Sequence, residues 1–288
     1  MNRNYCLDFL DTIRQRENGF EFWDLVHNSH ISFDSFYCKV IELVSSLTQK
    51  GITKKTCIYT LENSVESFIL CFAIQVAHNS IVLIPPEDNI KINELAASLS
   101  AQYIFIPTND SSDMSKKKSG DFFSYTVRNT TSDKSANSSS DQYVFFLTSG
   151  STGEQKVVKH FISSTFLMAV RVSEFLSHYP LGRKTLLLLP TYHIYGYVDV
   201  LLSCMYMGIG IAVGRGLITI NEDIKMVRPS CLFCVPALLN MFYNYSRTLE
   251  DNNVVNYLGG EIQTLLSGGG PLDPAFPRYI TMLSREAV

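Results

Sequence analysis

The chain has 288 residues, 46% of them hydrophobic, and a formal net charge of −3 at pH 7. This length can bury a substantial core, arranged as one large domain or as two subdomains. The 24 basic residues are nearly balanced by 27 acidic ones, which argues against a nucleic-acid-binding protein, because such a protein concentrates positive charge.

The first third of the sequence predicts alternating helices and strands. A helical pattern follows residues 31–36, and a helix over 64–77 leads into a strand at 80–84 that ends at two prolines. The core of this strand and the run 103–106 are continuously apolar, which is typical of strands covered on both faces. We expect residues 1–108 to form a first α/β subdomain portion.

Residues 109–141 are rich in Ser, Asn, Asp and Lys, with a strand-like interruption at 122–127, and predict a surface linker. The alternation then resumes, and residues 142–288 are expected to form a second α/β subdomain portion. Alternation of this kind implies right-handed crossovers and mainly parallel sheets flanked by helices, an α/β fold. The expected elements are strands at 143–147, 185–189, 231–235 and 262–266, and helices at 163–177 and 237–245.

The apolar stretch 197–213 approaches the length of a membrane span. Asp199, Ser203 and its glycines argue against a span, because polar groups are costly inside a bilayer. We expect a buried helix that is broken at Gly208, followed by a short strand at 209–213.

The most informative motif directly follows the strand at 143–147. Its glycines allow the backbone to approach a ligand closely. Its hydroxyls and one ammonium group suit the oxygens of a polyphosphate. Neither the Walker A spacing nor the dinucleotide fingerprint fits, and the alternative interpretation is a hairpin turn with a surface lysine. The motif reads Thr148-Ser149-Gly150-Ser151-Thr152-Gly153-Glu154-Gln155-Lys156.

The order Thr-Ser-Gly-Ser-Thr-Gly-x-x-Lys resembles the phosphate-binding loop of the adenylate-forming superfamily. That superfamily includes acyl- and aryl-CoA synthetases, luciferases and the adenylation domains of peptide synthetases. Gln155 replaces the proline that usually precedes the lysine, which should loosen the turn without removing a donor. The resemblance covers the chain from about residue 20 to its end, and includes segments 55–64 and 227–239. It implies that ATP phosphates are bound by Thr148, Ser149, Gly150, Ser151, Thr152, Gly153 and Lys156.

Two more segments resemble this superfamily. Residues 186–197 look like the place where a strand meets the acid-binding helix, which implies that His193, Tyr195 and Gly196 border the acid substrate. Without that context, a histidine between tyrosines is more often structural. Residues 265–272 resemble the turn along adenine and imply contacts from Gly268, Gly269, Gly270 and Pro271. A glycine triplet alone would indicate only a strand-to-helix connection.

Several segments of the superfamily are missing from the sequence. Relatives carry an aromatic-Gly-x-Thr-Glu segment whose glutamate holds Mg²⁺, then a ribose-binding aspartate and a small domain with a catalytic lysine. The resemblance therefore implies that this chain contains no catalytic residue and no metal ligand of its own. A Mg²⁺ ligand is expected downstream of residue 288, and the chain alone is expected to be inactive.

The resemblance implies activation of a carboxylic acid by ATP, followed by transfer to the thiol of CoA or of an acyl carrier protein. The segment around His193 is closer to acyl- and aryl-acid ligases than to amino-acid-activating domains. Two alternatives are a non-catalytic nucleotide- or acyl-binding protein derived from the family, and an unrelated α/β protein whose loop is only a tight turn.

The seven cysteines are scattered through mostly apolar stretches, and no apolar signal segment follows Met1. We expect reduced, buried thiols in a cytoplasmic protein. Cys231 and Cys234 form a Cys-x-x-Cys without a second pair, so core packing is favoured over metal or redox chemistry.

Overall fold

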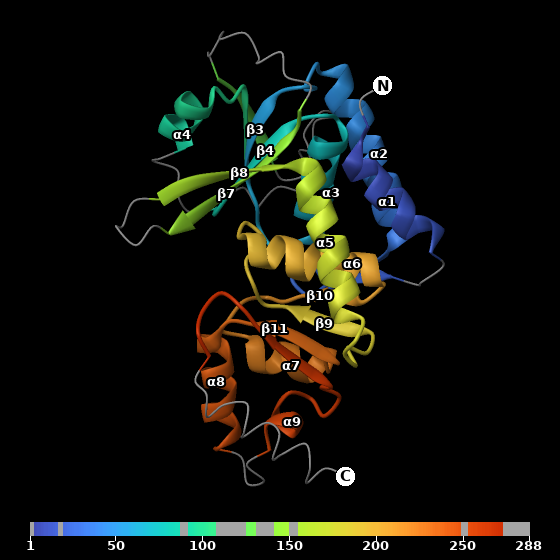
Figure 1. Ribbon diagram of the computed structural model, residues 1–288, viewed down its shortest axis with the longest axis vertical. Coiled ribbons are helices and arrows are strands. Elements are labelled where there is room, and N and C mark those ends of the chain that lie inside the picture. Colours follow the sequence, from blue (N-terminus) through green and yellow to red (C-terminus); the bar gives the residue numbers. More distant parts are fainter. Residues whose placement is uncertain are drawn as a thin grey trace.

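The computed structural model describes residues 3–16, 20–86, 92–107, 125–130, 141–149, 155–248 and 253–272. Its elements form five layers, in which two β-sheets alternate with three layers of helices (Figure 1). The central layer holds α1 (Tyr5–Gln15), α2 (Phe33–Gln49), α3 (Val65–Val76), α5 (Ile162–Leu176) and α6 (Ser203–Met207). The outer layers hold α4 (Ile92–Leu99) on one side, and α7 (Ile220–Val227), α8 (Pro236–Ser246) and α9 (Val254–Tyr257) on the other.

Sheet B has the strand order β6-β5-β3-β4-β7-β8. Its interior strands are buried on both faces, as the continuous apolar runs predict. Ile81 and Leu83 point into the large core beneath the central helices, whereas Val82 and Ile84 join a smaller core beneath α4. The strands are β3 (Thr56–Thr60), β4 (Ser80–Ile84), β5 (Tyr103–Pro107), β6 (Tyr125–Asn129), β7 (Tyr143–Ser149) and β8 (Gln155–Phe161).

Sheet A has the order β12-β11-β9-β10-β1-β2, and all of its pairings except β1 with β2 are parallel. The predicted strands after residue 184 are confirmed here. The hairpin β1–β2 is not predicted by the sequence pattern, because two strands of four residues are too short to show a clear period. The strands are β1 (Glu21–Asp24), β2 (Ser29–Ser32), β9 (Lys184–Leu187), β10 (Gly210–Val213), β11 (Cys231–Cys234) and β12 (Thr264–Ser267).

The two sheets do not follow the division of the chain expected at residues 108 and 142. β1 and β2 come early in the sequence but belong to sheet A, where β1 pairs with β10 and β2 pairs with β1. Conversely, β7 and β8 follow the expected linker but belong to sheet B, where β7 pairs with β4 and β8 pairs with β7. The chain therefore enters sheet A, leaves it for sheet B and returns, and the domain boundaries stay a prediction.

Two segments of the central layer follow directly from their sequences. Every residue of α3 except Glu66 is buried, which its nearly uniform apolar sequence predicts. The stretch after residue 194 forms η2, a π-helix over Tyr195–Leu202, and then α6. Gly208 ends α6 in the left-handed conformation, with φ of +73°, before β10 begins. The predicted helix, its break at Gly208 and the following strand are confirmed.

The cysteines are unpaired, and six of the seven are buried, with Cys38 the exposed one. Cys231 and Cys234 lie in β11 within the core of sheet A. Burial raises the pKa of each of these two thiols to about 12, so they carry no reactive thiolate. Core packing of the Cys-x-x-Cys is confirmed.

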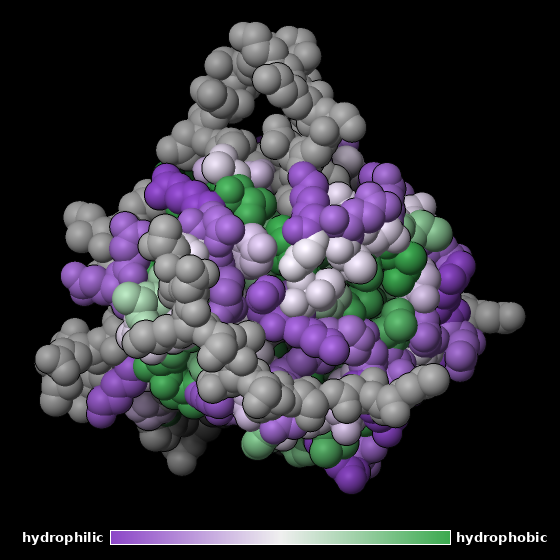
Figure 2. Space-filling model, turned by 90° about the horizontal axis from the view of Figure 1, so that it is seen from above, coloured by the Kyte–Doolittle hydropathy of each residue, from purple (hydrophilic) through white to green (hydrophobic). Residues whose placement is uncertain are grey.

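Among the described residues, no helix combines the length and the apolar character needed to cross a bilayer. On the face seen in Figure 2, hydrophilic side chains are interspersed with smaller hydrophobic areas. Exposed apolar side chains gather on α5, which exposes Leu167, Met168 and Phe175 by more than half of their surfaces.

Candidate functional site

The predicted acid and adenine segments lie at the same edge of sheet A. Residues 188–196 follow β9, residues 235–236 follow β11, and residues 268–272 follow β12. Because these strands are parallel, their carboxyl ends all meet at this edge. Ligands of open α/β sheets bind in the crevice outside such carboxyl ends. The topology therefore brings together two segments that lie more than 70 residues apart in the sequence.

The two ends of the predicted phosphate loop lie on two paired strands. β7 and β8 pair antiparallel, with Thr148 opposite Lys156 and Ser149 opposite Gln155. Both Thr148 and Lys156 are exposed, and the Thr148 hydroxyl donates to the Lys156 carbonyl at 3.4 Å. Four predicted residues, Gly150, Ser151, Thr152 and Gly153, lie outside the described residues.

The strand β8 is absent from the sequence-based expectation, which places Lys156 on a loop. Side chains 156–159 are all exposed. Because none of them needs to be apolar to face a core, the sequence of β8 shows no alternation of polar and apolar residues that would predict a strand. The pairing of β8 with β7 holds the backbone of Lys156 in place. The position of Lys156 is therefore fixed by a ladder of hydrogen bonds, while its side chain reaches solvent.

His193 lies beside the strand that leads into the phosphate loop. Its backbone N–H donates to the Pro190 carbonyl at 3.2 Å, and its carbonyl accepts from Tyr197 at 2.9 Å. Partial burial of the ring lowers the pKa of His193 from its ordinary value, and a hydrogen bond with the backbone of Leu147 opposes that shift. Leu147 is the residue immediately before Thr148 in β7. The predicted acid and phosphate segments are therefore neighbours in space.

Tyr195 lies against the predicted adenine segment. A Cβ atom on Gly268 would lie 2.7 Å from Cζ of Tyr195, so only glycine leaves room for the ring. Gly268 is held by its N–H, which donates to the Cys234 carbonyl at 3.1 Å. Gly269 has φ of +78°, a conformation that favours glycine. Burial raises the pKa of the Tyr195 phenol, which stays uncharged near neutral pH.

Gly196, Gly270 and Pro271 have different surroundings. A Cβ on Gly196 would lie 2.3 Å from the Pro190 carbonyl oxygen, so this glycine allows η2 to begin directly on the preceding turn. Gly196 is buried, whereas Gly270 and Pro271 are exposed at the site edge. The roles of these residues toward acid and adenine stay predictions.

Two residues near the site are not singled out as site residues by the sequence. Asp199, in the first turns of η2, is partly buried, and desolvation raises its pKa to about 6.

Asn63 holds the turn that precedes His193, and its only sequence signal is an amide directly after a buried strand and before a helix cap. π-Helical segments such as η2 are rare and are found preferentially at functional sites.

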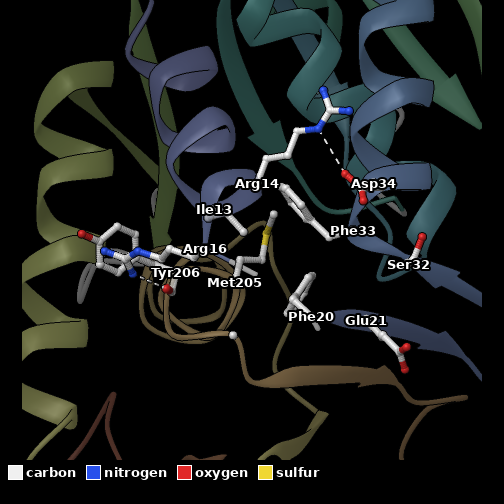
Figure 3. Close-up of a pocket in the computed structure, with 11 residues that line it drawn as sticks. Ile13, Arg14, Arg16, Phe20, Glu21, Ser32, Phe33, Asp34, Met205 and Tyr206 are labelled. Carbon is white, nitrogen blue, oxygen red and sulfur yellow. Dashed lines mark hydrogen bonds and ion pairs between the residues drawn. The ribbon is translucent and has the colours of Figure 1, made fainter. Parts of the chain in front are cut away.

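A cavity of about 140 Å³ lies at the opposite edge of sheet A (Figure 3). Phe20 directly precedes β1 and Gly208 is two residues before β10, so the cavity is at the amino ends of these strands. Around it, Arg14 pairs with Asp34, and Arg16 lies over Tyr206 (Figure 3). The cavity contains no predicted site residue. Within the part of the chain that the structure describes, no group of three or more His, Cys, Asp or Glu could hold a metal ion.

Comparisons with solved structures place this architecture in a known class. A luciferase-like enzyme from Zophobas morio superposes with a TM-score of 0.71 at 19% identity, covering 98% of this chain and 70% of its own. The N-terminal domain of FACL13 from Mycobacterium tuberculosis gives 0.69 at 16%, covering 98% and 74%. The AMP complex of o-succinylbenzoate CoA synthetase from Bacillus subtilis gives 0.69 at 14%, covering 98% and 57%. No curated protein matches the chain in sequence.

The structural likenesses show that this chain shares the fold of these solved proteins. The family model for "AMP-binding enzyme" matches residues 14–284, and the chain belongs to this family. The predicted family and α/β fold are confirmed, and the alternative of an unrelated α/β protein is excluded.

Proposed function

We propose that this chain is the N-terminal part of an ATP-dependent ligase that activates a carboxylic acid as an acyl adenylate. The observation that carries the proposal is the convergence of three segments. Phe146 of β7 packs against Tyr197 of η2 with ring centroids 5.9 Å apart, and Tyr195, at the start of η2, lies over Gly268. The predicted acid and adenine segments at the edge of sheet A thus lie close to the β7 strand of sheet B, which supports a shared site.

The β7–β8 hairpin would bind the β- and γ-phosphates of ATP. Lys156 supplies an exposed ammonium group at a position fixed by strand pairing, and the Thr148 hydroxyl lies directly opposite. An ammonium group and a hydroxyl are donors that suit phosphate oxygens. Gly268 and Gly269 would lie along the adenine, because a backbone without side chains allows a flat base to approach closely.

His193 would border the carboxylate that is activated. Its lowered pKa favours the neutral imidazole, which can donate one hydrogen bond and accept another. A neutral ring orients the acid without placing a fixed positive charge on it. Tyr195 would separate the acid from the adenine, since its ring packs on Gly268.

In the proposed reaction, a carboxylate oxygen attacks the α-phosphorus of ATP and the bond to the bridging oxygen of pyrophosphate breaks. Catalysis of this kind depends on positioning and on neutralising charge. Mg²⁺ would neutralise phosphate charge when bound. The described residues hold no cluster of metal ligands, so we propose no metal-binding residue in this part of the chain. We further propose that a thiol of CoA or of a carrier protein attacks the acyl carbon of the adenylate, which forms a thioester and releases AMP.

Binding of nucleotide and acyl-nucleotide tests this function without requiring turnover. Isothermal titration calorimetry should give saturable binding of AMP, and tighter binding of at least one sulfamoyl adenosine from a panel with aliphatic and aryl acyl groups. A folded chain that binds neither would contradict the proposal. AMP binding with no gain from any acyl group would contradict the acid site and would support a nucleotide-binding protein without ligase activity.

A further inference from the structure

The side-chain amide of Asn63 makes three hydrogen bonds to a turn from a distant part of the chain. Its Oδ1 accepts from the backbone N–H of Thr191 at 3.0 Å and from the Thr191 hydroxyl at 2.8 Å. Its Nδ2 donates to the Leu189 carbonyl at 2.8 Å. Three of the four hydrogen bonds that an amide side chain can make are thus used on residues 189–191.

Asn63 is itself presented by a rigid support. The next residue, Ser64, caps α3 by accepting from the Ser67 N–H at 3.1 Å. The carboxylate of Asp24, only 2% exposed, accepts from the Val65 N–H at 3.2 Å. Because Asp24 ends β1, this bond ties the start of α3 to sheet A. Asn63, two residues before that start, therefore reaches the turn from a fixed support.

The turn that Asn63 holds sets the start of the acid segment. Pro190 lies between the two residues bonded to Asn63, and its carbonyl accepts from the His193 N–H at 3.2 Å. The same carbonyl oxygen lies where a Cβ on Gly196 would be, at 2.3 Å. The backbone on both sides of Tyr195 is therefore placed against Pro190.

We infer that Asn63 is a positioning residue, which fixes the turn at residues 189–191 and thereby places the His193 ring beside Leu147 and the Tyr195 ring over Gly268. The use of this arrangement for acid activation rests on the proposed function. The positional claim does not, because the environment of the His193 ring can be measured without any ligand.

The histidine titration followed by NMR tests this inference, with the His193 signal assigned by its loss in a His193→Gln variant. Asn63→Ala should release the turn and raise the pKa of His193 toward its ordinary value, because the ring would lose its partial burial. Asn79→Ala is the matched control. Asn79 is buried and also makes three hydrogen bonds, to Ile52, Ile74 and Lys55, but it lies at the amino ends of β3 and β4.

The control should destabilise the chain to a similar extent and leave the His193 titration unchanged. Equal shifts in the two variants, or no shift in folded Asn63→Ala, would overturn the inference. If Asn63→Ala does not fold, Thr191→Val removes only the hydroxyl bond to Asn63 and should shift the titration in the same direction, while Thr191→Ser should restore it. A chain that fails to bind AMP but shows these shifts would refute the proposed function and retain the positioning role.

Discussion

The Tyr195 ring occupies the space that a side chain on Gly268 would need, with Cζ of Tyr195 2.7 Å from the position of a Cβ atom. The two residues are 73 positions apart, and they join the start of η2 to the end of β12. This contact joins the predicted acid segment to the predicted adenine segment, so a change at either residue should affect the other.

Gly268→Ala should lower the free energy of unfolding by about 1–3 kcal/mol, because the added methyl group collides with a ring that is packed in place. Urea denaturation measures this change. Gly270→Ala is the matched control, since its Cβ would lie 3.7 Å from Cγ of Pro236, an ordinary contact. In a Tyr195→Ala background, Gly268→Ala should lower the free energy of unfolding much less, because the ring it collides with is gone. Equal losses for Gly268→Ala and Gly270→Ala would show that the packing described is incorrect.

Asp199→Asn should stabilise the chain at neutral pH. Burial raises the pKa of Asp199 to about 6, so the folded state binds a proton more tightly than the unfolded state does. The free energy of unfolding therefore falls as the pH rises from about 4 to about 6, because ionised Asp199 is disfavoured in the folded state, and it stays lower above that range. The advantage of Asp199→Asn should grow over the same interval and reach about 1–2 kcal/mol at pH 7.5.

Urea denaturation at pH 4 and pH 7.5 gives the comparison for Asp199. Glu94→Gln, an exposed carboxylate on α4, should change the free energy of unfolding by only a few tenths of a kcal/mol at both pH values. If Asp199→Asn and the parent differ by the same amount at both pH values, the carboxylate is not desolvated as described.

Thiol labelling should distinguish one cysteine from the other six. Cys38 is exposed on α2 and should react rapidly with a disulfide reagent, whereas the six buried thiols should react only after unfolding. Cys38→Ser should remove the fast phase, and the urea-unfolded chain should show all seven thiols of the parent. Rapid labelling of Cys231 or Cys234 in the native state would contradict their packing in the core.

The elements with strong sequence patterns are predicted well. The continuous apolar runs at β4 and β5 predict buried strands, and the same apolar character predicts α3 and η2–α6 with the break at Gly208. Each of these segments is decided by local pattern and burial. The family resemblance also directs attention to residues that lie together at one edge of sheet A, whose roles stay predictions.

The remaining features depend on contacts that no local pattern encodes. β1 joins sheet A only because β10, nearly 190 residues later, returns beside it. β8 carries no alternation, since it lies at an edge of sheet B with exposed side chains. The contact of Tyr195 with Gly268 and the bonds of Asn63 to Thr191 likewise appear only after the chain has folded.

The most direct test of the central claim compares ATP and AMP binding by calorimetry in the parent, Lys156→Ala and Lys159→Ala. Loss of a charge-assisted hydrogen bond to phosphate should weaken ATP binding by about 10- to 100-fold in Lys156→Ala. AMP binding should be unchanged, because AMP lacks the β- and γ-phosphates. Lys159 lies on the same strand, and its Nζ is 3.6 Å from the centre of the Tyr143 ring. Its substitution should change the affinity for neither ATP nor AMP. Equal ATP affinity in Lys156→Ala and the parent would contradict the phosphate-binding hairpin, and with it the proposed site.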